Sequence, residues 1–334
     1  MAVNLAINGF GRIGRNILRA LMERAPGDLK IVAINDLAPL DTLAHLFEFD
    51  SIHGRYPHEI TVSDGLLDIG RGPIRFTHEA APENLSWADV DLVLECTGHF
   101  RDVTQAARHH SNGSRRVLLS APARGHAKTI CYGINHNDIG PKDRIVSNAS
   151  CTTNCLVPIA HVLDQNFGIR RGHMTTVHSY TGNQPLHDSP HDDLYRARAA
   201  ALSMIPTSTG AAETLGLVLP KLAGRITGTA VRVPTANVSC IDLVVELERE
   251  TTEADVNAAM HAAAKGALKG VLSVTDRKLV STDFNHDPHS AIFATDQTTL
   301  QQGNLLRVLA WYDNEWAFSN RMLDTAGIIA SQPH

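Results

Sequence analysis

The stretch VNLAINGFGRIGRNILRALMER, residues Val3 to Arg24, decides the fold of this chain. A short, mostly apolar run is followed by three glycines, Gly9, Gly11 and Gly14, which fit the pattern G-x-G-x-x-G. The letters after them, RNILRALMER, repeat apolar residues at helical spacing. The pattern predicts a strand, a tight turn and a helix. The glycines permit the turn, let the backbone approach a pyrophosphate and let the helix pack close to the strand.

The next apolar run, KIVAIND, ends in an acidic residue, Asp36, about 20 residues beyond Gly14. A carboxylate at this place can accept hydrogen bonds from a ribose diol, and it would repel a 2′-phosphate. The glycines alone would also fit an ordinary strand-to-helix turn. Because strand, helix, second strand and terminal acid all follow in order, we expect a dinucleotide site that prefers NAD to NADP.

The alternation of strands and helices continues through the first half of the chain. DLVLECTG and RRVLLSAP are predicted as buried parallel strands, with DVTQAARHHSNG as the helix between them. TICYGIN and RIVSNAS are predicted as further strands, and the segment between Glu59 and Thr77 as a small hairpin excursion with a turn at SDG. This pattern is typical of an α/β fold.

Composition excludes several classes of protein. The 334 residues include 30 Lys and Arg against 35 Asp and Glu, a net charge of −5, with no basic patch for nucleic acid or an anionic membrane. No apolar run approaches the roughly 18 residues of a membrane-spanning helix, and the N-terminus does not resemble a secretory signal. The five cysteines are odd in number and scattered, which argues against a disulfide framework, and none belongs to a zinc-ligand pattern. We expect a cytoplasmic protein without a metal.

The stretch SNASCTTNC, residues Ser147 to Cys155, contains two of these cysteines four residues apart. Cys151 opens the helical pattern CTTNCLVPIAHVLDQNFG, and a helix N-terminus stabilises a thiolate. Cys155 lies one turn further along and would point into the packing, while Pro158 suggests a kink or a late start of the helix. This segment alone leaves two interpretations open: a reactive thiol with a bystander, or two inert buried cysteines.

Residues that suit an anionic substrate follow the cysteines. His178, in the strand-like TTVHSYTGNQ, could serve as a base if it meets Cys151 in space. Hydroxyls, arginines and a helix start gather further along the chain, at Arg196, Arg198, Ser208, Thr209, Gly210 and Arg232. The arginines could equally be solvated, or paired with Asp192 and Asp193.

Over essentially its whole length the chain resembles the phosphorylating glyceraldehyde-3-phosphate dehydrogenase family. The matching stretches, in matching order and spacing, are INGFGRIGR, HGRYP, SNASCTTNC, HSYTGNQ, IPTSTGAA, AVRVPTANVS and WYDNEW. The resemblance implies an α/β, Rossmann-type NAD-binding domain over residues 1–150 and an α+β catalytic domain with a mostly antiparallel sheet over residues 151–314. It also implies a C-terminal helix, within residues 315–334, that returns to the first domain. The expected assembly is a homotetramer in which the loop after His178 packs against a neighbouring subunit.

The resemblance also implies the reaction and its residues. Cys151 would attack the aldehyde of glyceraldehyde 3-phosphate, and His178 would take the hemithioacetal proton as hydride passes to NAD. Inorganic phosphate would then attack the thioester and release 1,3-bisphosphoglycerate. The cofactor-binding residues implied are Gly9, Gly11, Arg12, Ile13, Gly14, Asp36, Thr97, Ser120 and Asn314. Thr181 and Arg232 would hold the substrate phosphate, and the attacking phosphate would be held by Ser150, Thr152, Arg198, Thr209 and Gly210.

Three other classes of protein share some of these residues. Erythrose-4-phosphate dehydrogenase is a sister enzyme that uses the same thiol and cofactor but finishes with water, and DFNHDPHSAI looks rather like that family. STGAA and HSYTGNQ favour the phosphorylating enzyme, because the sister family alters them. A cysteine hydrolase would leave the glycine pattern without a use, and a silent NAD-binding or RNA-binding protein would not need the Cys–His pair. Asn183 and Ala317 depart from the residues frequent in the family, Asp and Gly.

Overall fold

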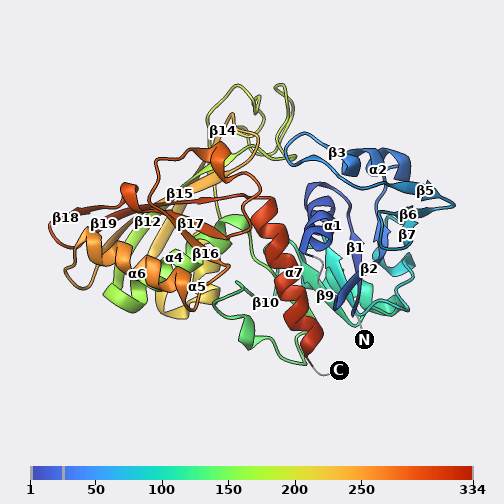
Figure 1. Cartoon of the computed structure of the whole chain (residues 1–334), viewed down its shortest axis with the longest axis horizontal. Coiled ribbons are helices and arrows are strands. Elements are labelled where there is room, and N and C mark those ends of the chain that lie inside the picture. The colour runs from blue at the N-terminus through green and yellow to red at the C-terminus, as the bar shows by residue number, and fades with distance from the viewer. Residues whose placement is uncertain (1–2, 25–26, 333–334) are drawn as a thin grey trace. The chain divides into compact units, whose positions relative to one another are not determined.

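The computed structural model describes residues 3–24 and 27–332. By its internal contacts the chain divides into two units. Unit 1 contains the described residues up to Ala149 together with those from Ser319 onward, and unit 2 contains Ser150–Phe318. Each unit is built around its own large sheet (Figure 1).

In the described part of unit 1, nine strands form one sheet with a parallel centre. The order across the sheet is β10 (Lys128–Thr129), β11 (Ile145–Ser147), β9 (Arg116–Leu119), β8 (Leu92–Glu95), β1 (Val3–Asn8), β2 (Leu29–Asn35), β7 (Ile74–Thr77), β6 (Leu66–Asp68) and β5 (Thr61–Ser63). All pairs from β10 to β7 are parallel, and β6 and β5 add an antiparallel edge. The predicted α/β, Rossmann-type fold is confirmed, including a hairpin that turns at Asp64 and Gly65.

One predicted strand is wrong for most of its length. Of TICYGIN, only Thr129 belongs to a strand, the two-residue β10, and a turn follows. The side chain of Asn135 accepts a hydrogen bond from the backbone N–H of Cys131 and donates one to the carbonyl of Thr129. Gly133 has a φ of 89°. A side chain that satisfies local backbone groups in this way competes with sheet pairing, and apolar letters do not reveal it.

Three of the helices of unit 1, α1 (Arg12–Arg24), α3 (Val103–Ala106) and α7 (Trp316–Ser331), lie where helices were predicted, whereas α2 (Leu40–Glu48) was not predicted. Helix α3 is continued by the 3-10 segment η2 (Ala107–Asn112), and two further 3-10 turns are η1 (Pro82–Asn84) and η3 (His136–Asp138). After α2 the short strands β3 (Phe49–Asp50) and β4 (Gly54–Arg55) pair. Helix α7 (Trp316–Ser331) belongs to unit 1 from Ser319 onward, where Asp324 pairs with Arg24 at 2.5 Å and Thr325 donates to Asn148.

The first and third glycines of the opening pattern are needed for steric reasons. Gly9 has a φ of 94°, and a Cβ there would lie 2.6 Å from the backbone nitrogen of Thr97, at the end of β8. A Cβ on Gly14 would lie 2.2 Å from the carbonyl oxygen of Gly9. A Cβ on Gly11 would meet no atom within 4 Å. The turn therefore packs tightly against its own unit and is open at Gly11, where a ligand can approach.

In the described part of unit 2, eight strands form a mixed sheet in which most pairs are antiparallel, as predicted. The parallel pairs are β12 with β14 and β16 with β17. The order is β13 (Ile205–Ser208), β14 (Ile226–Val233), β12 (Ile169–Ser179), β15 (Ser239–Leu247), β19 (Leu305–Tyr312), β17 (Ala291–Ala294) and β16 (Leu272–Thr275), with β18 (Thr299–Gln301) pairing with β19.

Three α-helices lie together along one side of this sheet (Figure 1): α4 (Cys151–Phe167), α5 (Ala211–Val218) and α6 (Glu253–Lys265). Helix α4 begins at Cys151 with Pro158 inside it, so the late start considered from the sequence is wrong. Short 3-10 turns complete the unit at η4 (Pro220–Leu222), η5 (Ser281–Phe284) and η6 (Thr295–Gln297). Among the described residues of both units, no helix is long and apolar enough to span a membrane.

Candidate active site

Unit 1 contains a pocket of about 400 Å³ at the carboxyl ends of β1, β2 and β8. Ligands of parallel sheets bind at this edge, and the volume lies in the range of small-molecule sites. Four of the predicted cofactor-binding residues line it: Gly9, Gly11, Asp36 and Thr97. Gly14 lies behind Gly9, as its steric contact shows.

Asp36 is held in place by backbone groups from two segments. One oxygen of its carboxylate accepts a hydrogen bond from the N–H of Phe10 at 2.7 Å, and the other accepts from Ala38 at 3.0 Å. The first of these bonds ties the end of β2 to the glycine turn. Each oxygen keeps a lone pair, so the carboxylate can still accept from a ribose hydroxyl.

The remaining predicted cofactor residues of unit 1 are placed differently. The guanidinium of Arg12 lies 2.5 Å from Asp50. Burial alone would raise the pKa of Asp50, but Arg12 and two backbone N–H groups outweigh it and lower the pKa to about 2. The charge of Arg12 is therefore already paired. Ile13 is half-buried next to it, and Ser120 donates its backbone N–H to the carbonyl of Glu95.

In unit 2 the structure brings Cys151 and His178 together. Cys151 is the first residue of α4, where Ser150 caps the helix by accepting a hydrogen bond from the N–H of Thr153 at 3.1 Å. His178 lies on β12, 27 residues further along, and its Nε2 is 3.5 Å from the Cys151 sulfur. The condition set for His178 from the sequence, that it meet Cys151 in space, is fulfilled.

Nδ1 of His178 has two polar neighbours of opposite kind. It is 2.7 Å from the carbonyl oxygen of Ser179, which can only accept, and 2.9 Å from Nη1 of Arg232, which can only donate. Nη1 of Arg232 also donates to that carbonyl at 2.9 Å, so the positive charge faces the imidazole ring. The tautomer with hydrogen on Nδ1 leaves a lone pair on Nε2, which faces the thiol.

Burial and Arg232 together set the protonation of the pair. Burial raises the pKa of the Cys151 thiol, although Arg232, Thr152 and the N–H groups of the helix start oppose it. Burial and then Arg232 lower the pKa of His178 to about 3. The sequence interpretation expected the helix start to stabilise a thiolate. The helix start does act in that direction, but burial is the larger influence on the pKa of Cys151.

Cys155 differs from Cys151 in its surroundings. Its side chain is fully buried, with the sulfur 3.9 Å from the carbonyl oxygen of Ala310. Burial raises the pKa of Cys155 well above its usual range. All five cysteines have free thiols. Among the described residues, no cluster of His, Cys, Asp and Glu could hold a metal ion.

The predicted anion-binding residues are only partly brought together. Arg232 donates to the hydroxyl of Thr181 at 3.4 Å, and that hydroxyl donates to Asn183 at 2.7 Å. In the second set, Thr209 accepts from the N–H of Ala211 at the start of α5, next to Gly210. The hydroxyl of Thr152 is shared with Tyr312 at 2.9 Å.

Of the two arginines before β13, Arg196 pairs with Asp193, as the alternative from the sequence proposed, whereas Arg198 pairs with a different carboxylate. Arg198 is exposed and pairs with Asp188 at 2.8 Å. Arg196 lies 3.5 Å from Asp193 and donates to Thr207 at 2.9 Å. Neither cation is without a counter-charge, so nothing in the described structure directs Arg198 to a ligand.

Asn314 has a fixed orientation that the sequence did not reveal. Its Oδ1 accepts hydrogen bonds from the hydroxyls of Ser179 and Ser239, both at 2.9 Å. Its Nδ2 group has no acceptor among the described residues and remains able to donate. Next to it, the buried carboxylate of Asp313 accepts from Asn237 and from the backbone of His286 and Trp316. The serines escaped sequence reasoning because a serine in a strand carries no distinctive signal.

Comparisons with known proteins agree with the geometry of both units. Residues 3–103 match the family model described as glyceraldehyde 3-phosphate dehydrogenase, NAD binding domain, and residues 150–314 match that of the C-terminal domain. Similar proteins named glyceraldehyde-3-phosphate dehydrogenase occur in Cereibacter sphaeroides, 59% identical over 326 residues, and in Xanthobacter flavus, 56% identical over 328 residues. Each alignment covers 98% of both chains. A further relative of that name from Geobacillus stearothermophilus is 50% identical over 99% of both chains.

Proposed function

The chain belongs to the glyceraldehyde-3-phosphate dehydrogenase family, and on that premise we propose that it oxidises glyceraldehyde 3-phosphate to 1,3-bisphosphoglycerate through a thioester on Cys151. The observation that carries the proposal is the pair formed by Cys151 and His178, in which Nε2 lies 3.5 Å from the sulfur of the thiol. A nucleophile and a base in this relation are what acyl transfer at sulfur requires.

The first step uses groups that unit 2 supplies. The Cys151 sulfur attacks the aldehyde carbon, a C–S bond forms, and His178 Nε2 accepts the thiol proton and returns a proton to the oxygen of the hemithioacetal. As the hemithioacetal is oxidised to the thioester, His178 takes the hydroxyl proton again. Burial, and after it the charge of Arg232, lowers the pKa of His178 to about 3, so the imidazole is unprotonated and can accept a proton over the physiological pH range.

NAD fits unit 1 by the shape of the glycine turn. Gly9 and Gly14 leave no room for a side chain, Gly11 opens to the pocket, and Asp36 presents a carboxylate fixed by two N–H groups. When bound, NAD supplies the acceptor for the hydride. We assign the nicotinamide carboxamide to Asn314, because its oriented Nδ2 group is available to donate.

Two sets of groups support two anions. Arg232 and Thr181 form one set, and we assign the substrate phosphate to it because the cation has no carboxylate partner among the described residues. We assign the attacking phosphate to Ser150, Thr152, Thr209 and Gly210, which lie at the starts of α4 and α5, because the N–H groups of a helix start favour an anion. Phosphate held there would attack the thioester carbon, the C–S bond would break, and Cys151 would leave as the thiolate.

A homotetramer is the assembly we propose. The segment between β12 and β13 exposes large apolar side chains, which are between 62% and 81% exposed at Leu186, Leu194, Tyr195, Leu202 and Met204. Apolar surface concentrated in one segment is typical of an interface between subunits. Light scattering that gave a stable, active monomer would contradict this assembly. Free thiols at all five cysteines support the cytoplasm as the place of the enzyme.

The experiment that tests the function is NADH formation from glyceraldehyde 3-phosphate, with and without inorganic phosphate. We expect steady turnover with phosphate, and without it a burst near one NADH per active site followed by a slow residual rate. The same assay with erythrose 4-phosphate tests the sister activity, which none of the relatives named above supports. Full turnover in phosphate-free buffer would exclude the phosphorylating reaction.

A further inference from the structure

Four strands of unit 1 end in polar side chains that form one continuous hydrogen-bonded network. Thr77, Asn35, Asn8 and Glu95 are the last residues of β7, β2, β1 and β8. Thr77 donates to Asn35 at 2.8 Å, Asn35 donates to Asn8 at 2.8 Å, and Asn8 donates to the Glu95 carboxylate at 2.6 Å. We call these four residues the edge network, because they follow the edge of the sheet where the pocket lies.

All the donors in the edge network point the same way. A carboxylate can only accept, so Glu95 forces Asn8 to turn its NH₂ group towards it and its oxygen towards Asn35. Asn35 must then turn its NH₂ group towards Asn8. The backbone of Glu79 requires the same orientation, because its N–H donates to the Asn35 oxygen at 2.8 Å and its carbonyl accepts from the Asn35 nitrogen at 2.9 Å.

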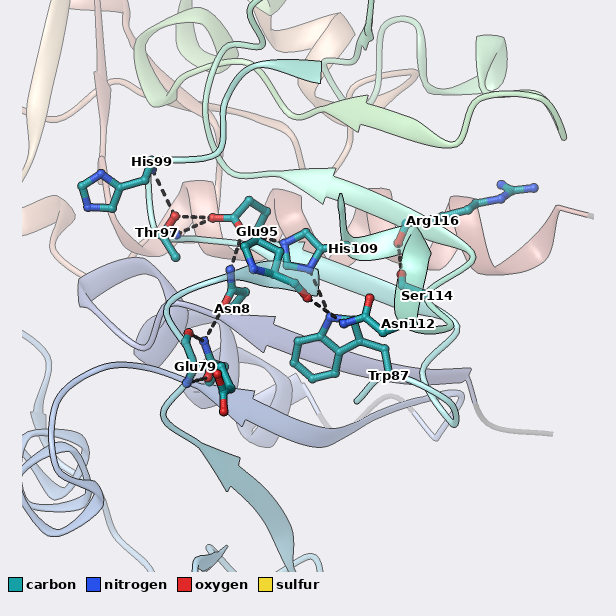
Figure 2. A network of polar contacts seen from close by, with 12 residues as sticks. Asn8, Glu79, Trp87, Glu95, Thr97, His99, His109, Asn112, Ser114 and Arg116 are labelled. Atoms are coloured by element: carbon teal, nitrogen blue, oxygen red, sulfur yellow. Dashed lines mark hydrogen bonds and ion pairs between the residues drawn. The ribbon is translucent and has the colours of Figure 1, made fainter. Parts of the chain in front are cut away.

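The other oxygen of Glu95 holds the turn that follows β8. It accepts from the backbone N–H of Thr97 at 2.8 Å and from the Thr97 hydroxyl at 2.5 Å. The same hydroxyl accepts from the N–H of His99 at 3.0 Å (Figure 2). Glu95 therefore fixes both the end of its own strand and the wall of the pocket formed by Thr97 and His99.

His109 completes the surroundings of Glu95 from the opposite side. Its Nδ1 accepts from the indole N–H of Trp87 at 3.1 Å, and an indole can only donate. His109 is therefore the neutral tautomer with hydrogen on Nε2, which donates to Glu95 at 3.0 Å (Figure 2). The Glu95 carboxylate is 3% exposed and His109 is fully buried, so four donors replace the water that Glu95 lacks.

The network lies directly behind the cofactor pocket. Asn8, Asn35, Glu79, Thr97 and His99 line the pocket, whereas Glu95 does not. We propose that Glu95 is a positioning residue for NAD: its buried carboxylate orients Asn8 and Thr97, and through Asn8 it orients Asn35, so that the pocket is formed before the cofactor binds. This role rests on NAD binding in unit 1 and is independent of the chemistry assigned to Cys151.

The substitution Glu95→Gln tests the role because no orientation of the glutamine satisfies the four donors. If the NH₂ group of the glutamine takes the place of Oε1, it faces the backbone N–H of Thr97, which cannot turn. If the NH₂ group takes the place of Oε2, it faces the NH₂ group of Asn8 and the N–H of His109. Asn8 could reverse only by setting its NH₂ group against that of Asn35, which Glu79 holds in place.

The experiment measures the NAD dissociation constant of the whole chain by titration calorimetry, with kcat and the KM for glyceraldehyde 3-phosphate at saturating NAD. For folded Glu95→Gln we expect the dissociation constant to rise at least about tenfold, the effect of losing a good charged hydrogen bond. We expect kcat, the aldehyde KM and the alkylation rate of Cys151 without NAD to stay within about twofold of wild type. Asp91→Asn is the matched control, since Asp91 accepts from the N–H of Asn4 at the other end of β8 and lies outside the network.

A second pair of variants covers the case in which Glu95→Gln does not fold. In His109→Gln the side-chain oxygen can accept from Trp87 and the NH₂ group can donate to Glu95, whereas His109→Leu can do neither. We expect His109→Leu to weaken NAD binding and His109→Gln to preserve it. The proposal is overturned if folded Glu95→Gln binds NAD as wild type does, if the two His109 variants bind NAD equally well, or if Cys151 alkylation falls along with NAD affinity. A wild-type chain that fails to bind NAD would instead overturn the proposed function.

Discussion

Glu95 in unit 1 is buried and Arg232 in unit 2 is half-buried, both near the ends of strands, yet their surroundings are opposite. Glu95 accepts four hydrogen bonds from three residues, and each donor is itself held by further bonds. Arg232 shares one nitrogen among Ser179, His178 and Thr181, and its buried Nε–H has no acceptor in the described part of the chain. No carboxylate there pairs with it, and burial lowers its pKa.

The difference in hydrogen-bond partners gives the two charges different roles: Glu95 positions its neighbours, whereas Arg232 acts on ligands and on reactive groups. A buried charge that fixed donors satisfy completely has nothing left to bind, so it can only hold its neighbours in place. A half-buried cation without a counter-charge attracts an anion and changes the proton affinity of the groups beside it. In unit 2 the positive charge of Arg232 opposes the rise in the pKa of Cys151 and adds to the fall in the pKa of His178.

The largest effect is expected for a substitution that abolishes the chemistry of unit 2 and leaves NAD binding in unit 1 unchanged. Cys151→Ser should lower turnover by more than about a thousandfold, because a hydroxyl is a far poorer nucleophile than a thiol beside the same base. NAD affinity, measured by calorimetry, should stay unchanged. Cys155→Ala serves as the control and should keep most of the activity, since the Cys155 side chain is fully buried and its sulfur meets the carbonyl oxygen of Ala310. Near-normal turnover of Cys151→Ser would remove the thioester mechanism.

Arg232→Gln tests whether the charge of Arg232 binds the substrate and acts on the thiol, in contrast to the positioning role of Glu95. We expect the KM for glyceraldehyde 3-phosphate to rise about tenfold to a hundredfold, the range for losing a charged hydrogen bond. The positive charge of Arg232 lowers the pKa of Cys151, so its removal should raise that pKa. Because the thiolate is the reactive form, the midpoint of the alkylation rate against pH should move to higher pH.

The control for this variant is Arg225→Gln, just before the same strand β14, where the arginine pairs with Glu248. It should leave the aldehyde KM and the alkylation profile unchanged. An alkylation midpoint that stays in place in Arg232→Gln would show that the charge does not act on the thiol.

Asp36→Asn tests whether unit 1 depends on a second fixed carboxylate. The asparagine must set its NH₂ group against the N–H of either Phe10 or Ala38, so we expect NAD affinity to fall about tenfold. The affinity for NADP should fall by a smaller factor than the affinity for NAD, because a charge that repels the 2′-phosphate of NADP has been removed. The ratio of kcat/KM for the two cofactors measures the change, and an unaltered ratio would show that Asp36 does not set the preference.

The smallest effect is expected where polar groups bridge packed elements of unit 2. The buried hydroxyl of Tyr312 contacts Thr152 on α4 and Thr176 on β12, both at 2.9 Å. Tyr312→Phe should lower the free energy of unfolding by about 1 kcal/mol, measured by urea denaturation, with turnover reduced only a few-fold. A large loss of turnover at unchanged stability would place the hydroxyl among the groups that act on the substrate.

Most of unit 1 could be predicted because its signals are local. The glycine turn, the helix after it and the acid at the end of the next strand lie within a short stretch of chain, where steric rules act between near neighbours. The same holds for Cys151 at the start of α4. The strand predicted for TICYGIN was wrong for a related reason. The hydrogen bonds of Asn135 to Thr129 and Cys131 are also local, but they involve side-chain geometry that apolar periodicity does not describe.

Local signals were enough to predict the strand–turn–helix start of the chain, the place of Asp36 and the cysteine at a helix N-terminus. Long-range packing was needed to bring His178 to Cys151, to leave Arg232 rather than Arg198 without a counter-charge, and to place Glu95 where it orients Asn8 and Thr97. This is because a pKa or an amide orientation depends on burial and on partners far away in the chain. In the edge network Thr77 and Asn35 lie 42 residues apart, and Asn8 and Glu95 lie 87 residues apart.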